Sequence, residues 1–331
     1  MRNTKPKFLE NKIKMKYIYG PVPSRRLGNS LGIDPIPSKT CNYQCIYCQL
    51  GRTTNFTNIR CNYFPKDQII AELEKAIELH EKSMDYITFV GSGEPTLYKD
   101  LKDLMLKVKE LSTKPICVIT NGSLLNHKEI QETLMLSDLV LPSLDAGDKK
   151  TFIKINRPHP SLEFKKIIQG LKSFKKIYNG QFWIEVMLVR GINDSKQDLV
   201  KIKEKIDLIN PDKIDINVPI RPPMEKWVKI PDKNTLSILN EIFVDYSNIN
   251  FPEKGKFRTY SSNFEKELIS ILERHPMREE QIIETFSSPT FSKNEIISQL
   301  KRLKFQKKIK DICYNNQIFW KLDMDKNKAN N

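Results

Sequence analysis

From about residue 28 to 245, short apolar runs rich in β-branched residues alternate with amphipathic helical stretches. Six of these runs have the length and composition of strands that are buried on both faces. They cover residues 30–34, 86–90, 116–120, 139–144, 182–189 and 213–218. Six β-then-α units in series predict parallel strands joined by right-handed crossovers. Because a closed (β/α)8 barrel needs two more units, we expect an α/β fold, a partial (β/α)6 TIM-like barrel with its chemistry on the loops that follow the strands.

The expected helices fill the segments between these strands. The first begins just after Pro65, and proline is a good helix-start signal. Later helices are expected over residues 101–111, 127–136, 162–178, 196–209 and 234–246. The core of the barrel is therefore expected to cover about residues 20–245.

A different pattern follows the barrel. The periodicity lapses over residues 246–261, which predicts a linker. Three helices and then two strands are expected after it, over residues 264–274, 278–286, 293–304, 309–314 and 317–322. Asn315-Asn316 between the strands is a hairpin signal. This order predicts a small winged-helix-like domain over residues 262–322, after a first domain of residues 1–257 and before a polar tail of residues 323–331.

The composition is that of a globular protein with an excess of positive charge. Hydrophobic residues make up 39% of the chain, charged residues make up 29%, and the formal net charge is +15. The excess is mostly lysine spread along the chain, which indicates either ordinary solvated helix faces or an anionic partner such as RNA. No apolar run approaches the roughly 18 residues needed to cross a bilayer, and the N-terminus has no apolar signal region. The sequence predicts a cytoplasmic protein without a membrane partner.

Three of the six cysteines crowd together directly after the first predicted strand. Cys41, Cys45 and Cys48 are spaced too closely for a disulfide framework in a chain of this length, so they indicate a metal site. Three thiolates can hold three corners of an iron–sulfur cube and leave the fourth iron free to bind a small molecule. The alternatives are a plain electron-transfer cluster and a structural zinc site with Cys61 as its fourth ligand. Zinc sites usually have a second paired arm, which this sequence lacks.

The remaining cysteines and the histidines give weaker signals. Cys117 and Cys313 fall in apolar predicted strands, so we expect both of them to be small core residues. The histidines show no ligand spacing and are expected to be non-catalytic: His80, His127, His159 and His275.

The cysteine spacing, with Tyr47 before the last cysteine, resembles the signature of the radical SAM superfamily. The resemblance implies that Cys41, Cys45 and Cys48 hold a [4Fe-4S] cluster. It also implies that the open iron chelates the methionine part of S-adenosylmethionine (SAM), and that Tyr47 lies by the adenine. Both cofactors are therefore expected from this resemblance.

Further motifs follow the strands in the order that this family has them. The segment Gly91-Ser92-Gly93-Glu94-Pro95 follows the second strand and resembles the family's GGEP motif, with serine at the second position. Polar residues also stand at the ends of the third, fourth and fifth strands: Asn121, Ser143, Asp145, Arg190 and Asn193. The resemblance implies that all of these positions contact SAM.

Two further segments, residues 19–28 and 217–223, look like a subgroup of iron–sulfur oxidoreductases related to the archaeal wyosine-base (tRNA) synthase. That synthase carries additional upstream cysteines for a second cluster. No cysteine precedes Cys41 in this sequence, so the wyosine reaction itself is not expected. Arg25, Arg26 and Arg221 come from these segments and could bind a carboxylate or phosphate of the substrate. Ordinary surface ion pairing is the alternative.

The resemblance implies reductive cleavage of SAM into a 5′-deoxyadenosyl radical, which takes a hydrogen atom from the substrate. An external one-electron donor of the flavodoxin or ferredoxin type is the expected partner. The substrate could be RNA, a peptide or protein, or a small molecule. A non-enzymatic alternative is an iron–sulfur redox regulator that binds DNA through the winged helix.

Overall fold

Six parallel strands form the barrel that the sequence predicts. The computed structural model describes residues 15–248, 256–259 and 262–323. Its largest sheet has the strand order β1-β2-β5-β6-β7-β8-β9-β10. The six predicted strands are β2 (Gly28–Ile33), β5 (Tyr86–Phe89), β6 (Ile116–Thr120), β7 (Leu139–Pro142), β8 (Gln181–Met187) and β9 (Lys213–Asn217). Neighbours in this series pair in parallel, so the predicted partial barrel is confirmed.

The sequence does not predict the two strands at the edges of this sheet. β1 (Ile18–Ser24) pairs antiparallel with β2, and β10 (Ser247–Asn248) pairs parallel with β9. The β1 segment contains Gly20, Pro21 and Pro23, residues that argue against a central strand. An edge strand tolerates them because one of its sides makes no ladder hydrogen bonds. Two shorter strands, β3 (Thr40–Cys41) and β4 (Asn55–Phe56), form a separate parallel pair.

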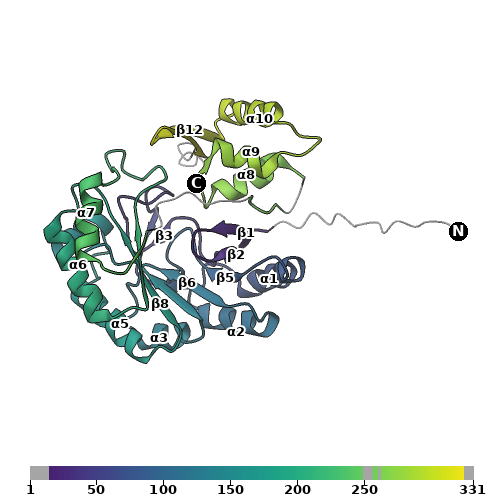
Figure 1. Cartoon of the computed structure of the whole chain (residues 1–331). Helices are drawn as coiled ribbons and strands as arrows, with labels where there is room; N and C mark the ends of the chain where they lie inside the picture. The colour runs from purple at the N-terminus through teal and green to yellow at the C-terminus, as the bar shows by residue number, and fades with distance from the viewer. Residues whose placement is uncertain (1–14, 249–255, 260–261, 324–331) are drawn as a thin grey trace.

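Helices form an arc around the outer face of the large sheet (Figure 1). The predicted ones are α1 (Lys66–His80), α2 (Leu101–Leu111), α3 (Lys128–Leu134), α5 (Phe164–Ile177), α6 (Lys196–Ile209) and α7 (Lys233–Ile242). One more helix, α4 (Lys149–Asn156), is not predicted, because a single helix is expected between each pair of strands and the segment between β7 and β8 holds both α4 and α5. Asp148 caps α4 by accepting a hydrogen bond from the Thr151 N–H at 2.8 Å.

Residues 262–323 form a small C-terminal module. Its elements, in order, are α8 (Phe264–Leu272), β11 (Met277–Arg278), α9 (Glu279–Phe286), α10 (Lys293–Phe305), β12 (Ile309–Tyr314) and β13 (Gln317–Leu322). The three strands form one sheet in the order β11-β13-β12. The predicted helices and hairpin are therefore present, and the winged-helix class of the module stays a prediction.

The C-terminal module has an apolar core of its own. The fully buried members of this core are Phe257, Leu268, Leu272, Met277, Ile282, Ile296, Leu300, Leu303, Ile309 and Trp320. Phe257 thus packs with the module, although the first domain is expected to include it. Most of the expected linker, and the expected tail beyond Asp323, lie outside the described residues.

The module sits beside β1, on the side where the arc of helices is open (Figure 1). The side chain of Val22 in β1 packs against the module's core. The Arg258 N–H donates to the Pro21 carbonyl at 3.4 Å, and the Tyr314 hydroxyl donates to the Pro219 carbonyl at 2.6 Å. The module therefore covers the side of the barrel that the sheet leaves open. Across the described residues, no helix is both long enough and apolar enough to span a membrane.

Candidate active site

The cysteine loop, residues 41–48, is held between β3 and the end of α4. Cys41 ends β3, and Cys45 and Cys48 follow in the loop; all three are free and half-buried. The loop is tied to α4 by two backbone hydrogen bonds, from Gln44 N–H to the Asn156 carbonyl at 3.0 Å and from Ile46 N–H to the Ile155 carbonyl at 3.0 Å. The unpredicted helix α4 thus fixes the positions of the cysteines.

A hydrogen-bond donor reaches each of the three sulfurs. The Lys39 ammonium donates to Cys48 Sγ at 3.1 Å, and the Asn156 amide donates to Cys45 Sγ at 3.5 Å. The Tyr43 N–H donates to Cys41 Sγ at 3.3 Å, and the Asn121 amide lies 3.8 Å from the same sulfur. Such donors stabilise negative charge on the sulfurs of an iron–sulfur site. The residues present therefore fit a thiolate-bound cluster.

The thiols themselves are not poised to ionise without a metal. Burial, together with the nearby Glu94 carboxylate, raises the pKa of Cys41 to about 12. Burial also raises the pKa of Cys45. Both groups would be protonated near neutral pH, so iron binding must displace their protons.

The backbone of Cys61, the fourth ligand in the zinc alternative, is held by the segment after Glu94. The Cys61 N–H donates to the Leu97 carbonyl at 3.1 Å and its carbonyl accepts from Lys99, which pairs Cys61 with the η1 turn (Pro95–Leu97). Cys117 is buried as expected. Cys313 is exposed, so its expected place in the core is wrong: on β12 it lies on the same face as Asp311, which is exposed too, while its neighbours Ile312 and Tyr314 are half-buried.

The Gly91–Pro95 motif packs directly against the strand that carries Cys41. A Cβ atom on Gly93 would lie 1.8 Å from the Thr40 carbonyl oxygen, so only glycine permits this approach. The Glu94 N–H donates to the same oxygen at 3.1 Å. The motif and the cysteine loop are therefore one packed unit.

The Glu94 carboxylate braces the ends of neighbouring strands. It is buried and accepts hydrogen bonds from the Thr120 hydroxyl at 2.6 Å and the Asn121 N–H at 2.7 Å. It also accepts from the Thr96 hydroxyl at 2.6 Å and the Thr96 N–H at 3.1 Å. Burial raises the pKa of Glu94 while these donors oppose the rise. Glu94 thus holds the loop after β5 against the end of β6.

Asp145 joins Tyr47 of the cysteine loop to Asn156 at the end of α4. Its Oδ2 accepts from the Tyr47 hydroxyl at 2.5 Å and from the Asn156 amide at 2.6 Å, and its Oδ1 accepts from the Met187 N–H at 2.8 Å. Burial raises the pKa of Asp145 to about 6, although the bond from Tyr47 opposes the rise. The Asn193 amide donates to the Asp145 carbonyl at 2.8 Å. Asp145 and Asn193 therefore fix the ring of Tyr47 beside Cys45.

We expect Asp145→Ala to weaken SAM binding and to leave the iron content unchanged. Tyr47, Asn156 and the Met187 N–H would lose their acceptor, and each buried donor left unsatisfied costs about 1–3 kcal/mol. SAM affinity and iron per chain, measured on the same anaerobic preparation, check this. Asp207→Ala, on the exposed face of α6, is the matched control. Unchanged SAM affinity in a folded, iron-loaded Asp145→Ala protein would remove Asp145 from the site.

Two other expected SAM contacts lie differently. Ser143 is half-buried at the end of β7 and its backbone bridges to Glu185 in β8, which places it at the barrel mouth. Arg190 is exposed, and its guanidinium lies 3.3 Å from the Asp232 carboxylate. The structure does not bring Arg190 together with the cysteine loop.

Ser92, where the motif departs from the family pattern, connects the motif to the C-terminal module. Its hydroxyl and its N–H donate to the Asp34 carboxylate at 2.8 Å and 3.1 Å. Asp34 ends the β2 segment, is only 3% exposed, and accepts from Arg274 Nε at 3.0 Å. Arg274 follows α8 in the module and its guanidinium lies over the Tyr19 ring at 5.0 Å. Sequence reasoning missed Asp34 and Arg274 because they are far apart in the chain.

We expect Arg274→Gln to destabilise the protein by about 3 kcal/mol, because removal of one partner leaves a buried carboxylate without its cation. Burial already raises the pKa of Asp34, and loss of Arg274 would raise it further. The folded state of the variant then binds more protons than its unfolded state. The loss of unfolding free energy relative to the wild type should therefore shrink as pH falls through the pKa of Asp34. Thermal unfolding at several pH values checks this.

Arg302→Gln is the control for this measurement. Arg302 lies in the same module and pairs with Glu265 at 2.8 Å, but it is largely exposed, so its loss should cost less than about 1 kcal/mol. Equal losses of unfolding free energy in the two variants would mean that the buried Asp34–Arg274 pair stabilises the protein no more than an exposed ion pair does.

The three arginines expected at the substrate site lie on the inside of the barrel. Arg25 donates to the Asn217 amide oxygen at 3.0 Å, and Arg221 donates to the amide oxygen of Gln49, just after the cysteine loop. Arg26 pairs with Glu185. The structure therefore brings Arg25 and Arg221 close to the cysteine loop, whereas Arg26 is held by a carboxylate of β8.

A model of the radical SAM superfamily matches residues 36–202, which contain the cysteine loop and the Gly91–Pro95 motif. The chain therefore belongs to the radical SAM superfamily. It is an iron–sulfur enzyme that uses a [4Fe-4S] cluster and SAM as cofactors and cleaves SAM.

The chain is also similar to individual proteins over most of its length. The UPF0026 protein of Methanocaldococcus jannaschii is 35% identical over 331 residues, which cover 96% of this chain and 100% of that protein. A Brachyspira hyodysenteriae protein named GTPase Obg is 40% identical over 298 residues, which cover 88% of this chain and 43% of that protein. The chain thus spans less than half the length of the latter relative.

A solved structure shares the fold. Streptococcus suis SuiB bound to its precursor peptide SuiA gives a TM-score of 0.50 at 16% identity, covering 67% of this chain and 48% of that one. The similarity shows a common fold.

Proposed function

We propose that Cys41, Cys45 and Cys48 hold the cluster and that SAM binds beside them across the ends of β5 to β8. When bound, the cluster supplies the electron that cleaves SAM to a 5′-deoxyadenosyl radical. The observation that carries the proposal is the donor on each cysteine sulfur, from Lys39, Asn156 and the Tyr43 N–H.

The other residues of the site have binding and positioning roles in this proposal. Gly91, Ser92 and Gly93 offer backbone to the methionine part of SAM, and Glu94 holds that backbone in place. Tyr47 lies by the adenine, fixed by Asp145. Asn121 donates to the Asn42 amide oxygen at 2.7 Å and approaches Cys41, and these contacts support a role for it at the edge of the cluster, next to SAM.

Ser143, Asn193 and Arg190 complete the proposed set with different degrees of support. Ser143 faces the barrel mouth, and Asn193 acts through Asp145. Arg190 would reach SAM only after leaving Asp232, so it is the weakest member.

The substrate is proposed to enter between the barrel and the C-terminal module, where Arg25, Arg26 and Arg221 lie. RNA is the candidate that the net charge of +15 supports. The segment from Lys301 in α10 to Lys310 in β12 holds six basic residues. Four of them are already paired with carboxylates: Arg302, Lys304, Lys308 and Lys310. This pairing weakens the module as an RNA-binding surface, so a peptide substrate remains the alternative.

A one-electron donor of the flavodoxin or ferredoxin type and a cytoplasmic location complete the proposal. Anaerobically reconstituted protein, given dithionite and SAM, should form 5′-deoxyadenosine even without a substrate. Chromatography of the quenched reaction measures it. Protein that holds about four irons per chain and forms no 5′-deoxyadenosine would contradict the proposed function.

A further inference from the structure

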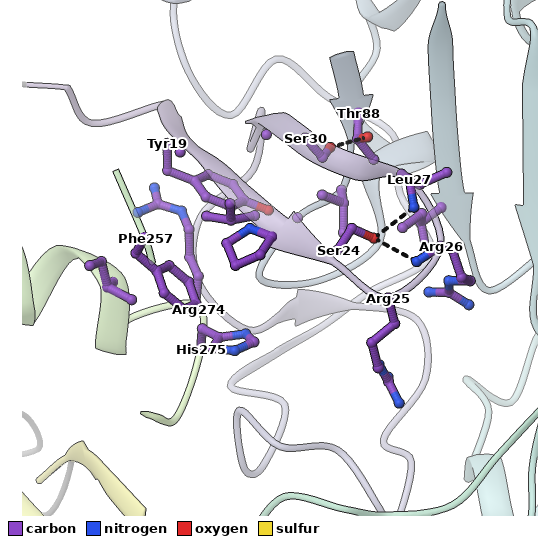
Figure 2. Close-up of a pocket in the computed structure, with 18 of the residues that line it drawn as sticks. Tyr19, Ser24, Arg25, Arg26, Leu27, Ser30, Thr88, Phe257, Arg274 and His275 are labelled. Atoms are coloured by element: carbon purple, nitrogen blue, oxygen red, sulfur yellow. Dashed lines mark hydrogen bonds between the residues drawn. The ribbon is translucent and has the colours of Figure 1, made fainter. Parts of the chain in front are cut away.

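A cavity of about 210 Å³ lies between the barrel and the C-terminal module (Figure 2). Its wall includes parts of β1 and β2, Gln49 next to the cysteine loop, and Gly91 of the SAM motif. The module contributes Phe257 and His275, which lie side by side in Figure 2 with their ring centroids 5.1 Å apart. The cavity therefore borders the proposed SAM site from inside the barrel.

The charged residues that line this cavity are all basic. Five arginines and one histidine line it, and no aspartate or glutamate is found among its described lining residues: Arg25, Arg26, Arg221, Arg258, Arg274 and His275. Carboxylates behind the wall offset part of this charge: Glu185 pairs with Arg26 and also acts on Arg25 and Arg221, and Asp34 pairs with Arg274. A cavity lined in this way has a positive potential.

Arg25 and Arg221 carry the charge at the centre of this region, and the neutral His275 lines the same cavity. Burial lowers the pKa of Arg221, and the charge of Arg25 lowers it further. Burial also lowers the pKa of His275, followed by the charges of Arg221 and then Arg25. All three side chains line the same cavity, although they come from the β1–β2 turn, the segment after β9 and the module.

His275 adds an independent sign of a ligand. Its Nε2 atom is buried and has no hydrogen-bond partner among the described residues. Buried polar atoms are nearly always hydrogen-bonded, so such an atom in the wall of a cavity is expected to meet a ligand or a water molecule.

We propose that this cavity binds a phosphoryl group of the substrate through Arg25, Arg221 and His275. A phosphate monoester carries a charge of about −1.5 to −2 at neutral pH and three acceptor oxygens, which suits several cations better than a carboxylate does. The planar guanidinium of arginine matches phosphate oxygens in pairs. The inference rests on the proposed function in one respect: that function places the radical next to the phosphoryl group of the substrate. The binding of phosphate to the cavity does not depend on the proposed function.

The test is calorimetric titration of the full-length, reconstituted protein with inorganic phosphate at constant ionic strength, with chloride as the reference salt. We expect the wild type to bind phosphate, and Arg25→Gln and Arg221→Gln to bind it at least about tenfold more weakly, since each loses a charged hydrogen bond. Arg302→Gln, outside the cavity, should bind as the wild type does. No binding by the wild type, or equal affinity in all four proteins, would overturn the proposal.

A second measurement uses only the wild-type protein, so it does not depend on whether the variants fold. Phosphate should slow the modification of Arg25 and Arg221 by phenylglyoxal, read by peptide mass spectrometry, and should not slow that of Arg302. Equal protection of all three, or protection by acetate as strong as that by phosphate, would overturn the phosphoryl assignment.

Competition identifies the source of the phosphoryl group. A ribonucleoside 5′-monophosphate should displace inorganic phosphate if the substrate is a small phosphate ester, and a short RNA without a terminal phosphate should do so if it is a nucleic acid. 5′-Deoxyadenosine formation is measured on the same preparations. Normal 5′-deoxyadenosine formation without phosphate binding would refute only this inference. Phosphate binding without 5′-deoxyadenosine formation would refute only the proposed function.

Discussion

Replacing any one of Cys41, Cys45 and Cys48 by alanine is expected to remove the cluster and all reductive cleavage of SAM. Each cysteine is proposed to hold one iron, so removal of one thiolate leaves one corner of the cluster without its protein ligand. Iron per chain, the broad visible absorbance and 5′-deoxyadenosine formation measure the effect. The wild type should hold about four irons, and the variants should hold none after anaerobic reconstitution.

The other cysteines supply the controls. Cys61→Ser and Cys313→Ser should keep the cluster, since Cys61 is bonded to the η1 turn and Cys313 is exposed on β12. Cys117→Ala should keep it too, at some cost in stability, because Cys117 is fully buried. Full iron content in the Cys45→Ala protein, or loss of iron in the Cys61→Ser protein, would require a different ligand set.

Gly93→Ala is expected to abolish SAM binding and to destabilise the fold by about 3 kcal/mol. The added Cβ would lie 1.8 Å from the Thr40 carbonyl oxygen and 2.7 Å from the Thr40 carbonyl carbon. These are backbone atoms next to Cys41, so either the SAM motif or the cysteine strand must move. An equilibrium titration with SAM measures the binding, and thermal unfolding measures the stability.

Ser92→Gly is the neighbouring control for this substitution. It restores the second glycine of the family motif and removes one hydrogen bond to Asp34, so it should retain SAM binding and cost about 1 kcal/mol. A Gly93→Ala protein that binds SAM as tightly as Ser92→Gly does would show that the close packing on Thr40 is not needed.

The sequence predicts the barrel well because its signal is local. Each of the six parallel strands is a short apolar run, and the long helices show their own period, so both can be recognised without knowledge of their neighbours. The edge strand β1 is missed because Gly20, Pro21 and Pro23 oppose a central strand, whereas an edge position accepts them. The helix α4 is missed because it lies in the same connection between β7 and β8 as the longer α5, where only one helix is expected.

The candidate site divides in the same way. The spacing of the cysteines indicates a metal site, and the resemblance to the family's motifs points to the cluster and to the Gly91–Pro95 motif. The groups that hold these residues in place give no such signal: Asn156 reaches Cys45 from α4, and Asp34 reaches Ser92 from the end of β2. Lys39 could have been suspected, since it stands close to Cys41 in the chain. His275 gives no signal in the sequence, because its neighbours Arg25 and Arg221 are distant in the chain.

The EPR spectrum of the dithionite-reduced protein, recorded with and without SAM, tests the central claim most directly. The claim is that three cysteines leave one iron of the cluster open and that SAM binds to it. The account predicts that SAM changes the spectrum of the reduced wild-type cluster, and that it does so less in the Asp145→Ala protein at equal SAM concentration. Identical spectra with and without SAM, in protein that holds about four irons per chain, would contradict the account.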